Sequence, residues 1–326
     1  MSAIEEVAAG GDVAAHGTRG TNGACGNCGA PLGGAFCAQC GQKRLSQADR
    51  TLGHLLAEGF RKVTDLDGTF LRSLRLLLFR PGLLSREYMD DRRVRYASPI
   101  SLFLLANVLY FVAPAMSDFN LPFADQVPGA MAVQSRDPAA PLPEAARARL
   151  IERQGGQLHS PWTQHLVQRK LAARQARDPA YDLHRLATDY NREAAVVGKV
   201  LIVAHVPIIA LALALVYWRR RRLFVEHTVV ALHQFTFLLL FAQLLLAPME
   251  WLVNRVGIRF PPPSGRLLGL ALVGLVFAYI LVACRTAYRT GWGGAVLGFV
   301  AVLTGVMVAN IVVYRALQFV VTLALL

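Results

Sequence analysis

Residues 194–222 read AAVVGKVLIVAHVPIIALALALVYWRRRR, and this stretch decides the class of fold. The segment 194–218 carries one charged side chain, Lys199. A helix of about 20 apolar residues is long enough to cross the roughly 30 Å hydrocarbon core of a bilayer. Four arginines follow it directly, and short basic loops stay on the cytoplasmic side of a membrane: Arg219, Arg220, Arg221 and Arg222. The stretch therefore predicts a membrane-spanning helix that ends in the cytoplasm.

Four other apolar segments extend this prediction to the rest of the chain. They are residues 97–116, 229–251, 267–284 and 294–314. The composition agrees, since 54% of the 326 residues are hydrophobic and the mean hydropathy is +0.39. We expect a mainly α protein, an integral-membrane helical bundle of about five spans. The apolar tail 315–326 is too short to cross alone, so it either extends the last span or lies at the membrane interface.

The positive charge is placed as membrane topology requires. The net charge is +13, and residues 196–326 hold 11 basic but only two acidic side chains, mostly between apolar segments. Arg92, Arg93 and Arg95 precede the first span, and Arg285 and Arg289 separate the last two. If the N-terminus is cytoplasmic, these arginines and the four after residue 218 all lie on the cytoplasmic side of the membrane. Only the basic loop 255–266 would then lie on the opposite side. This pattern favours a lipid bilayer over nucleic acid as the partner.

Cysteines near the start of the chain predict a small metal-binding unit over residues 25–45. Two CxxC pairs, Cys25 with Cys28 and Cys37 with Cys40, are each followed by glycine. Four thiolates complete the tetrahedral shell of a structural zinc ion and leave no position open for a substrate. The alternative is a pair of redox dithiols, which normally begin a helix in a βαβ unit. The fifth cysteine, Cys284, has no obvious partner, and unpaired thiols fit the reducing cytoplasm.

The remaining regions are less regular. Residues 1–24 are expected to form a disordered tail, and residues 46–96 a set of cytoplasmic, amphipathic juxtamembrane helices over 51–63, 69–79 and 83–90. The second of these carries Arg72 and Arg75 and is followed by Arg80. It either lies among lipid headgroups or packs its leucine face on neighbouring helices. Residues 117–193 are expected to form an extracytoplasmic loop that is partly helical, over 144–153, 162–177 and 182–192.

Three stretches in fixed order carry a family resemblance. They read CGNCGAPLGGAFCAQCGQK from residue 25, LDGTFLRSLRLLLFRPG from residue 66 and REYMDDRRVRYASPISLFLL from residue 86. Together they resemble an uncharacterised bacterial family of multi-pass membrane proteins with an N-terminal zinc ribbon, a domain of unknown function. The resemblance covers residues 25–112. It implies zinc binding by the four cysteines and a place in the bacterial cytoplasmic (inner) membrane, and it implies no known reaction.

Polar side chains within the spans are candidates for function. Ionisable groups in a bilayer are costly, so His205, His233 and Gln243 either line a proton or solute path or make hydrogen bonds between helices. No catalytic motif stands out, and an enzyme is not favoured. The preferred hypothesis is a membrane-anchored binding or scaffold protein whose ribbon docks a cytoplasmic protein, with a second copy of the chain as a further candidate partner. The alternatives are a transporter or channel-like protein and an integral-membrane enzyme acting on lipid or envelope substrates.

Overall fold

The computed structural model describes residues 23–44, 51–53, 68–112, 121–136, 143–144, 148–149, 159–256 and 264–326. Within these ranges the fold is helical, with two isolated β-bridges near the N-terminus. Four of the described helices are long and apolar enough to cross a membrane. The expectation of a mainly α fold with membrane-type helices and an N-terminal four-cysteine unit is confirmed. Most of the predicted tail 1–24, most of the predicted helices 51–63 and 144–153, and parts of 117–143 lie outside the described residues.

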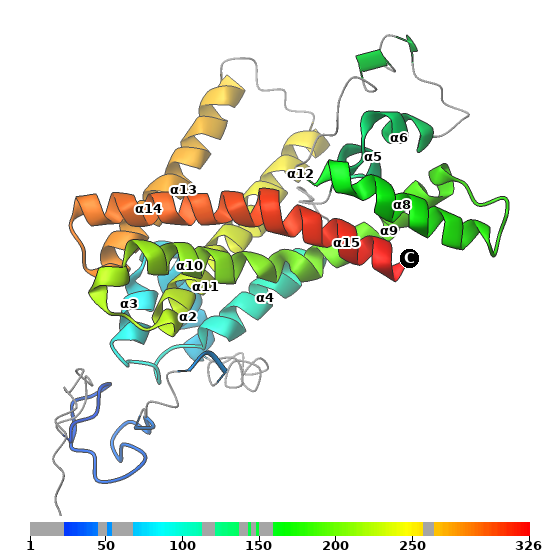
Figure 1. Cartoon of the computed structure of the whole chain (residues 1–326). Coiled ribbons are helices and arrows are strands. Elements are labelled where there is room, and N and C mark those ends of the chain that lie inside the picture. Colours follow the sequence, from blue (N-terminus) through cyan, green and yellow to red (C-terminus); the bar gives the residue numbers. More distant parts are fainter. Residues whose placement is uncertain are drawn as a thin grey trace, which may run out of the picture.

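Two composite helices form the long axis of the molecule (Figure 1). The first runs over Leu183–Val216, as α9 (Leu183–Leu201), a 3₁₀ turn (Ile202–Ala204) and α10 (His205–Val216). The second runs over Trp292–Leu325, as α14 (Trp292–Val308), a π-helical turn (Ala309–Tyr314) and α15 (Arg315–Leu325). Each has 34 residues, about 51 Å at 1.5 Å per residue, so both extend well beyond a 30 Å core. The apolar C-terminal tail thus continues the last span.

The other apolar helices pack around this pair. The third long helix joins α11 (Phe224–Phe241) through a π-helical turn (Ala242–Leu246) to α12 (Ala247–Val256), and the fourth is α13 (Ser264–Tyr288). The expected first span, 97–116, is described as far as residue 112. Its described part contains α4 (Pro99–Val112), whose 14 residues rise about 21 Å. Proline suits the first turn of a helix because its missing N–H has no partner there, which fixes the start of α4 at Pro99.

The helix α11 is the core of the bundle. Every residue from His227 to Phe237 is buried, and α11 contacts α3, α4, α10 and α13. A helix that is buried on all sides loses the polar stripe of a surface helix, so its apolar pattern carries little periodicity. On the far side of α10, small residues allow α14 to approach closely. A Cβ added to Gly305 would lie 3.0 Å from the Cα of Ile209, so the two backbones are almost in contact.

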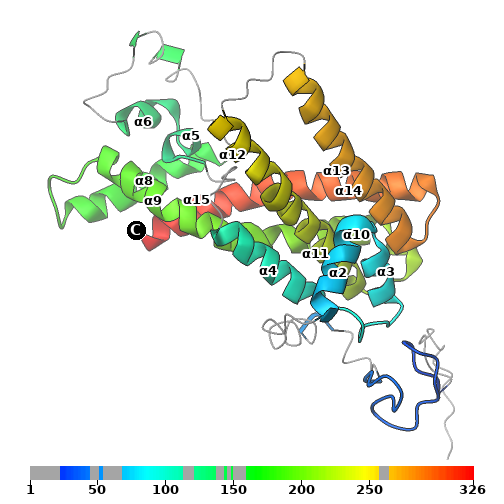
Figure 2. The same ribbon diagram turned by 180° about the vertical axis from the view of Figure 1, so that it is seen from behind.

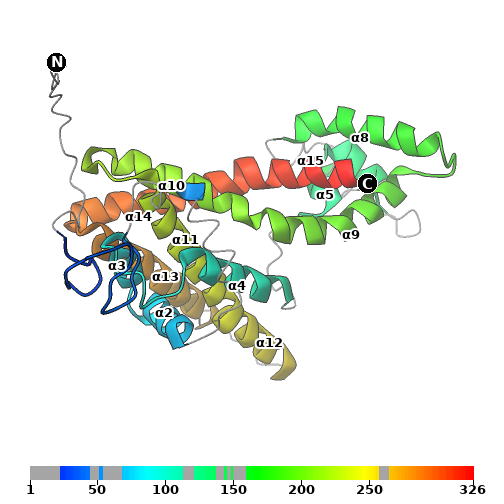
Figure 3. The ribbon, with the colours of Figure 1, turned by 90° about the horizontal axis from the view of Figure 1, so that it is seen from below.

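A second apolar cluster lies at the end of the molecule distant from α3. Figure 3 shows α8 (Ser160–Gln175) beside the continuations α9 and α15 of the two long helices. Two short helices, α5 (Phe123–Gln126) and α6 (Gly129–Gln134), cover α9. The rings of Phe123, Tyr190 and Phe319 pack against one another at the centre of this cluster, with Phe123 and Tyr190 edge to face. The two long helices therefore contribute to this second apolar cluster, through α9 and α15, as well as to the core of the bundle.

Two juxtamembrane helices pack on the opposite end. They are α2 (Gly68–Phe79) and α3 (Leu83–Met89), close to the predicted bounds 69–79 and 83–90. They lie side by side, and α3 contacts both α11 and α13 (Figure 2). The buried face of α2 holds Phe70, Ser73 and Leu77, while Leu71 and Phe79 stay exposed. One face of α2 therefore packs on the bundle, and the other face is exposed; its place among lipid headgroups stays a prediction.

Candidate metal centre

The four cysteines lie on two turns that repeat one hydrogen-bond pattern twelve residues apart. The amide of Gly29 donates to the Cys25 carbonyl, and the amide of Gly41 donates to the Cys37 carbonyl, each at 2.8 Å. Both glycines are left-handed, with φ of +78° and +72°. A side chain is strained in that conformation, so the glycine after each CxxC pair is a geometric requirement of the turn.

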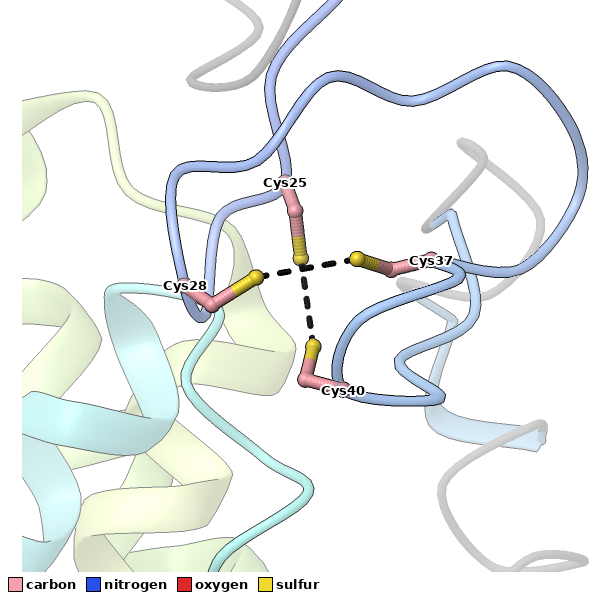
Figure 4. A group of neighbouring side chains, drawn as sticks. All are labelled: Cys25, Cys28, Cys37 and Cys40. Atoms are coloured by element: carbon pink, nitrogen blue, oxygen red, sulfur yellow. Dashed lines mark hydrogen bonds between the residues drawn. The ribbon is translucent and has the colours of Figure 1, made fainter.

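The sulfur atoms converge on one point (Figure 4). The Sγ atoms of Cys25 and Cys40 are 3.6 Å apart, as are those of Cys28 and Cys37. All four lie within 4.8 Å of one another. In a tetrahedral shell with Zn–S bonds of about 2.3 Å, the sulfurs would be about 3.8 Å apart. The donor set and its spacing therefore fit a four-coordinate thiophilic metal ion.

Neighbouring amides favour a thiolate at one of the cysteines. The pKa of Cys40 is lowered to about 6, because the Asn27 side chain and the Gln42 backbone form hydrogen bonds to its sulfur. The pKa of Cys28 is raised to about 12 despite a lowering backbone hydrogen bond from Ala30, because desolvation and the other three thiols disfavour more negative charge. Four thiolates this close need a cation to offset their repulsion.

The metal-binding unit is attached to the bundle through Asp91, which follows α3. The side-chain amide of Gln42 donates to the Asp91 carbonyl, and its oxygen accepts from the Arg93 amide at 3.4 Å. A Cβ added to Gly26 would lie 3.3 Å from the Asp91 Cβ, so the first turn also approaches this residue closely. The neighbouring Asp90 forms an ion pair with Arg289, at the end of α13. The cysteine unit therefore rests on the α3–α4 connection.

The predicted basic residues gather at this same end. Arg220 donates to the Tyr288 carbonyl at 2.9 Å, which brings the α10–α11 connection next to the end of α13. Other arginines pair with nearby acids, Arg92 with Glu87, Arg93 with Asp91 and Arg222 with Glu226. Further exposed arginines on this end are Arg72, Arg75, Arg80, Arg95, Arg219 and Arg221.

The three polar residues predicted within the spans are not brought together. His205 donates from its Nδ1 to the Ile202 carbonyl at 2.9 Å and stacks on Phe235, with ring centroids 5.1 Å apart. His233 is two residues from Phe235, on the opposite face of α11, where its Nδ1 lies 2.9 Å from the Ser85 hydroxyl. Gln243 lies ten residues further along, in the π-helical turn. These contacts are of the kind that hold helices together.

Sequence reasoning did not find the partners of the buried histidines. Ser85, 148 positions from His233, is an ordinary polar residue of a short helix. The Tyr288 hydroxyl and His227 Nδ1 share a 2.8 Å hydrogen bond, and both side chains are buried. Glu226 accepts a hydrogen bond from the Leu223 amide and caps the start of α11. A hydrogen bond between side chains that are far apart in the chain produces no pattern that can be recognised in a single sequence.

Comparison with known proteins gives one partial match. Residues 67–111 match a family model described as a protein of unknown function, DUF3667. This segment comprises α2, α3 and nearly all of α4, so the chain is similar to that family over the part that joins the cysteine unit to the bundle. No curated protein and no solved structure matches the chain.

Proposed function

We propose that this protein is a membrane-anchored scaffold whose zinc ribbon docks a cytoplasmic protein. The four long apolar helices would anchor it in the bacterial inner membrane. The four-cysteine unit would hold one structural zinc ion, and the N-terminus would lie in the cytoplasm.

The closed set of thiols carries this proposal. A metal held by Cys25, Cys28, Cys37 and Cys40 has no open coordination position for a substrate or an activated water molecule. The unit is fixed on the bundle at Asp91, while the side chain of Phe36, between the two turns, is 63% exposed. Exposed aromatic residues on a rigid support are frequent anchors of protein interfaces.

The placement of charge supports a cytoplasmic ribbon. The arginines of the α10–α11 connection, those after α3 and Arg289 lie at the end of the bundle that bears the cysteine unit. Arg255 and Arg266 lie towards the opposite end of α12 and α13. Short basic connections are retained in the cytoplasm, so this asymmetry favours the orientation in which the thiols meet a reducing solution.

The alternatives receive less support. The enzyme hypothesis requires His205, Glu226 and His233 to converge, yet each has a separate partner. A solute path through His205, His233 and Gln243 requires a shared lining. His205 of α10 packs on Phe235, which lies on the face of α11 opposite to His233.

Crosslinking in cells followed by mass spectrometry tests the docking role. We expect a protein captured by the wild type to be lost in Phe36→Ser and in Cys25→Ser/Cys28→Ser. Trp162→Ser is the matched control, because it removes a 75% exposed aromatic ring at the other end of the molecule. A partner list that is the same in all four proteins would refute docking at the ribbon.

A further inference from the structure

We propose that the exposed face of α2 binds the phosphate group of an anionic lipid. A pocket of about 620 Å³ opens between α2 and the segment before α4, lined by Arg72, Arg75, Leu76, Phe79, Arg80 and Tyr96. Its volume falls in the range of roughly 300–1,000 Å³ that is typical of small-ligand sites. This inference goes beyond the docking role and shares with it only the membrane location.

Helical spacing places the pocket residues on one face of α2. Positions 72, 75, 76, 79 and 80 follow the i, i+3, i+4, i+7, i+8 rule, so their side chains project together. The opposite face is fixed, because Leu77 is buried and its carbonyl accepts a hydrogen bond from Tyr279 of α13. The arginines are therefore carried by a helix that is held against a membrane-type span.

A hydrogen bond also fixes the two walls of the pocket to each other. The Ser73 hydroxyl accepts from the amide of Ala97 at 2.8 Å, next to Tyr96. Ser73 is fully buried and also donates to the Thr69 carbonyl at 2.7 Å. The spacing between α2 and the tyrosine is thus set before any ligand arrives, which reduces the entropic cost of binding.

The charge of the pocket requires an anion. The lining holds three arginines and no acidic residue. Four other arginines at this end pair with carboxylates: Arg92, Arg93, Arg222 and Arg289. Arg72, Arg75 and Arg80 form no ion pair within the described part of the chain, so their charge is open to a ligand. Guanidinium groups bind phosphate oxygens through paired, charge-assisted hydrogen bonds. Three of them on one wall therefore suit a phosphate group.

Apolar groups beside the arginines identify a lipid as the source of that phosphate. Phe79 is 74% exposed and Leu71 is 68% exposed, so α2 presents apolar surface next to its charges. A soluble phosphate would leave both side chains in water, whereas the acyl chains of a lipid would cover them. Tyrosine is enriched where apolar and polar layers of a membrane meet, and Tyr96 stands at the pocket wall.

Lipid titration of the full chain tests this proposal. Native mass spectrometry in detergent would measure the apparent Kd for phosphatidylglycerol and for zwitterionic phosphatidylcholine. We expect Arg72→Gln/Arg75→Gln/Arg80→Gln to weaken phosphatidylglycerol binding by about tenfold or more. Arg219→Gln/Arg221→Gln/Arg285→Gln, which removes three exposed charges at the same end, should change it less than about twofold. Equal unfolding midpoints would establish that both variants are folded.

Each other outcome overturns the proposal. Equal losses in the two triple variants would indicate general attraction to a basic surface. Unchanged binding in both would exclude the pocket. Displacement of the lipid by glycerol phosphate at the same concentration as by phosphatidylglycerol would make the site one for soluble phosphates. None of these results depends on a protein partner, so they are separate from the test of the ribbon.

Discussion

Removing the metal from the cysteine unit is expected to unfold residues 23–44 and to leave the helical bundle folded. In this unit only Cys25, Cys37 and Gln42 are buried, so it has no apolar core. Its six backbone hydrogen bonds contribute about 1 kcal/mol each. Ordering its 22 residues costs at least about 1 kcal/mol for each residue, which those bonds cannot offset. The binding of a structural metal, about 10–16 kcal/mol in small zinc units, has to supply the difference.

Unfolding of the cysteine unit should lower the stability of the helical bundle only slightly. The unit contacts the α3–α4 connection through two hydrogen bonds, both made by the Gln42 side chain. At about 0.5–1.5 kcal/mol each, their loss lowers the stability of the bundle by about 1–3 kcal/mol. The buried contacts around α11 are unaffected, because they involve α3, α4, α10 and α13.

Hydrogen exchange with mass spectrometry, before and after a strong chelator, measures both effects. We expect the amides of Cys25, Gly29, Cys37 and Gly41 to lose protection, while those of α10, α11 and α14 keep it. Metal analysis should give one zinc ion per chain in the untreated protein. Cys284→Ser is the control, since this buried thiol lies in α13 and should leave the metal content unchanged. A cysteine unit that stays protected after the metal is removed would contradict this prediction, and so would spans that lose protection together with the cysteine unit.

Three further predictions concern stability and its pH dependence. Gly82→Ala should lower the free energy of unfolding in detergent by about 2–4 kcal/mol, because Gly82 has a φ of +75° and a Cβ there would lie 2.8 Å from the Cα of Ala283 in α13. Gly269→Ala is the control and should be neutral or stabilising, since a Cβ at Gly269 would lie in open space. Ser85→Ala should cost about 1–3 kcal/mol by leaving His233 Nδ1 unpaired, and an unchanged midpoint would refute that bond. Burial, and secondarily a nearby arginine, lower the pKa of His159 below its ordinary 6.5. The unfolded state then binds the proton more readily, so stability should fall as the pH drops below about 6.5, by at most about 1.4 kcal/mol per unit, and His159→Gln should flatten this slope.

The sequence predicts those features that depend on neighbouring residues. A CxxC pair followed by glycine specifies its own turn, so the cysteine unit could be inferred before its geometry was known. An apolar run of sufficient length specifies a membrane-type helix in the same way. The helix predicted over 182–192 likewise runs into the span predicted from residue 194. The backbone is helical from Leu183 onward, and Asp182 accepts a hydrogen bond from the Arg185 amide at its start.

The same limit applies to the polar groups inside the bundle. The spacing of residues along α11 shows which side chains share a face of the helix, yet it does not show which neighbouring helix each face contacts. His233 meets Ser85 of α3, and His205 meets Phe235 of α11. Because α3 packs between α11 and α13, a seven-residue helix before the first apolar helix supplies contacts that no pattern within the spans reveals.

The matched segment 67–111 therefore connects the cysteine unit to the helical bundle. Through Asp91 it supports the cysteine unit, through Ser85 it reaches the buried α11, and through Leu77 it is tied to α13. A ribbon on a free tether would bind a partner independently of the membrane part. Here the ribbon, the bundle and the basic pocket all contact one short run of helices, so a partner that docks on the ribbon meets a surface whose position the bundle sets.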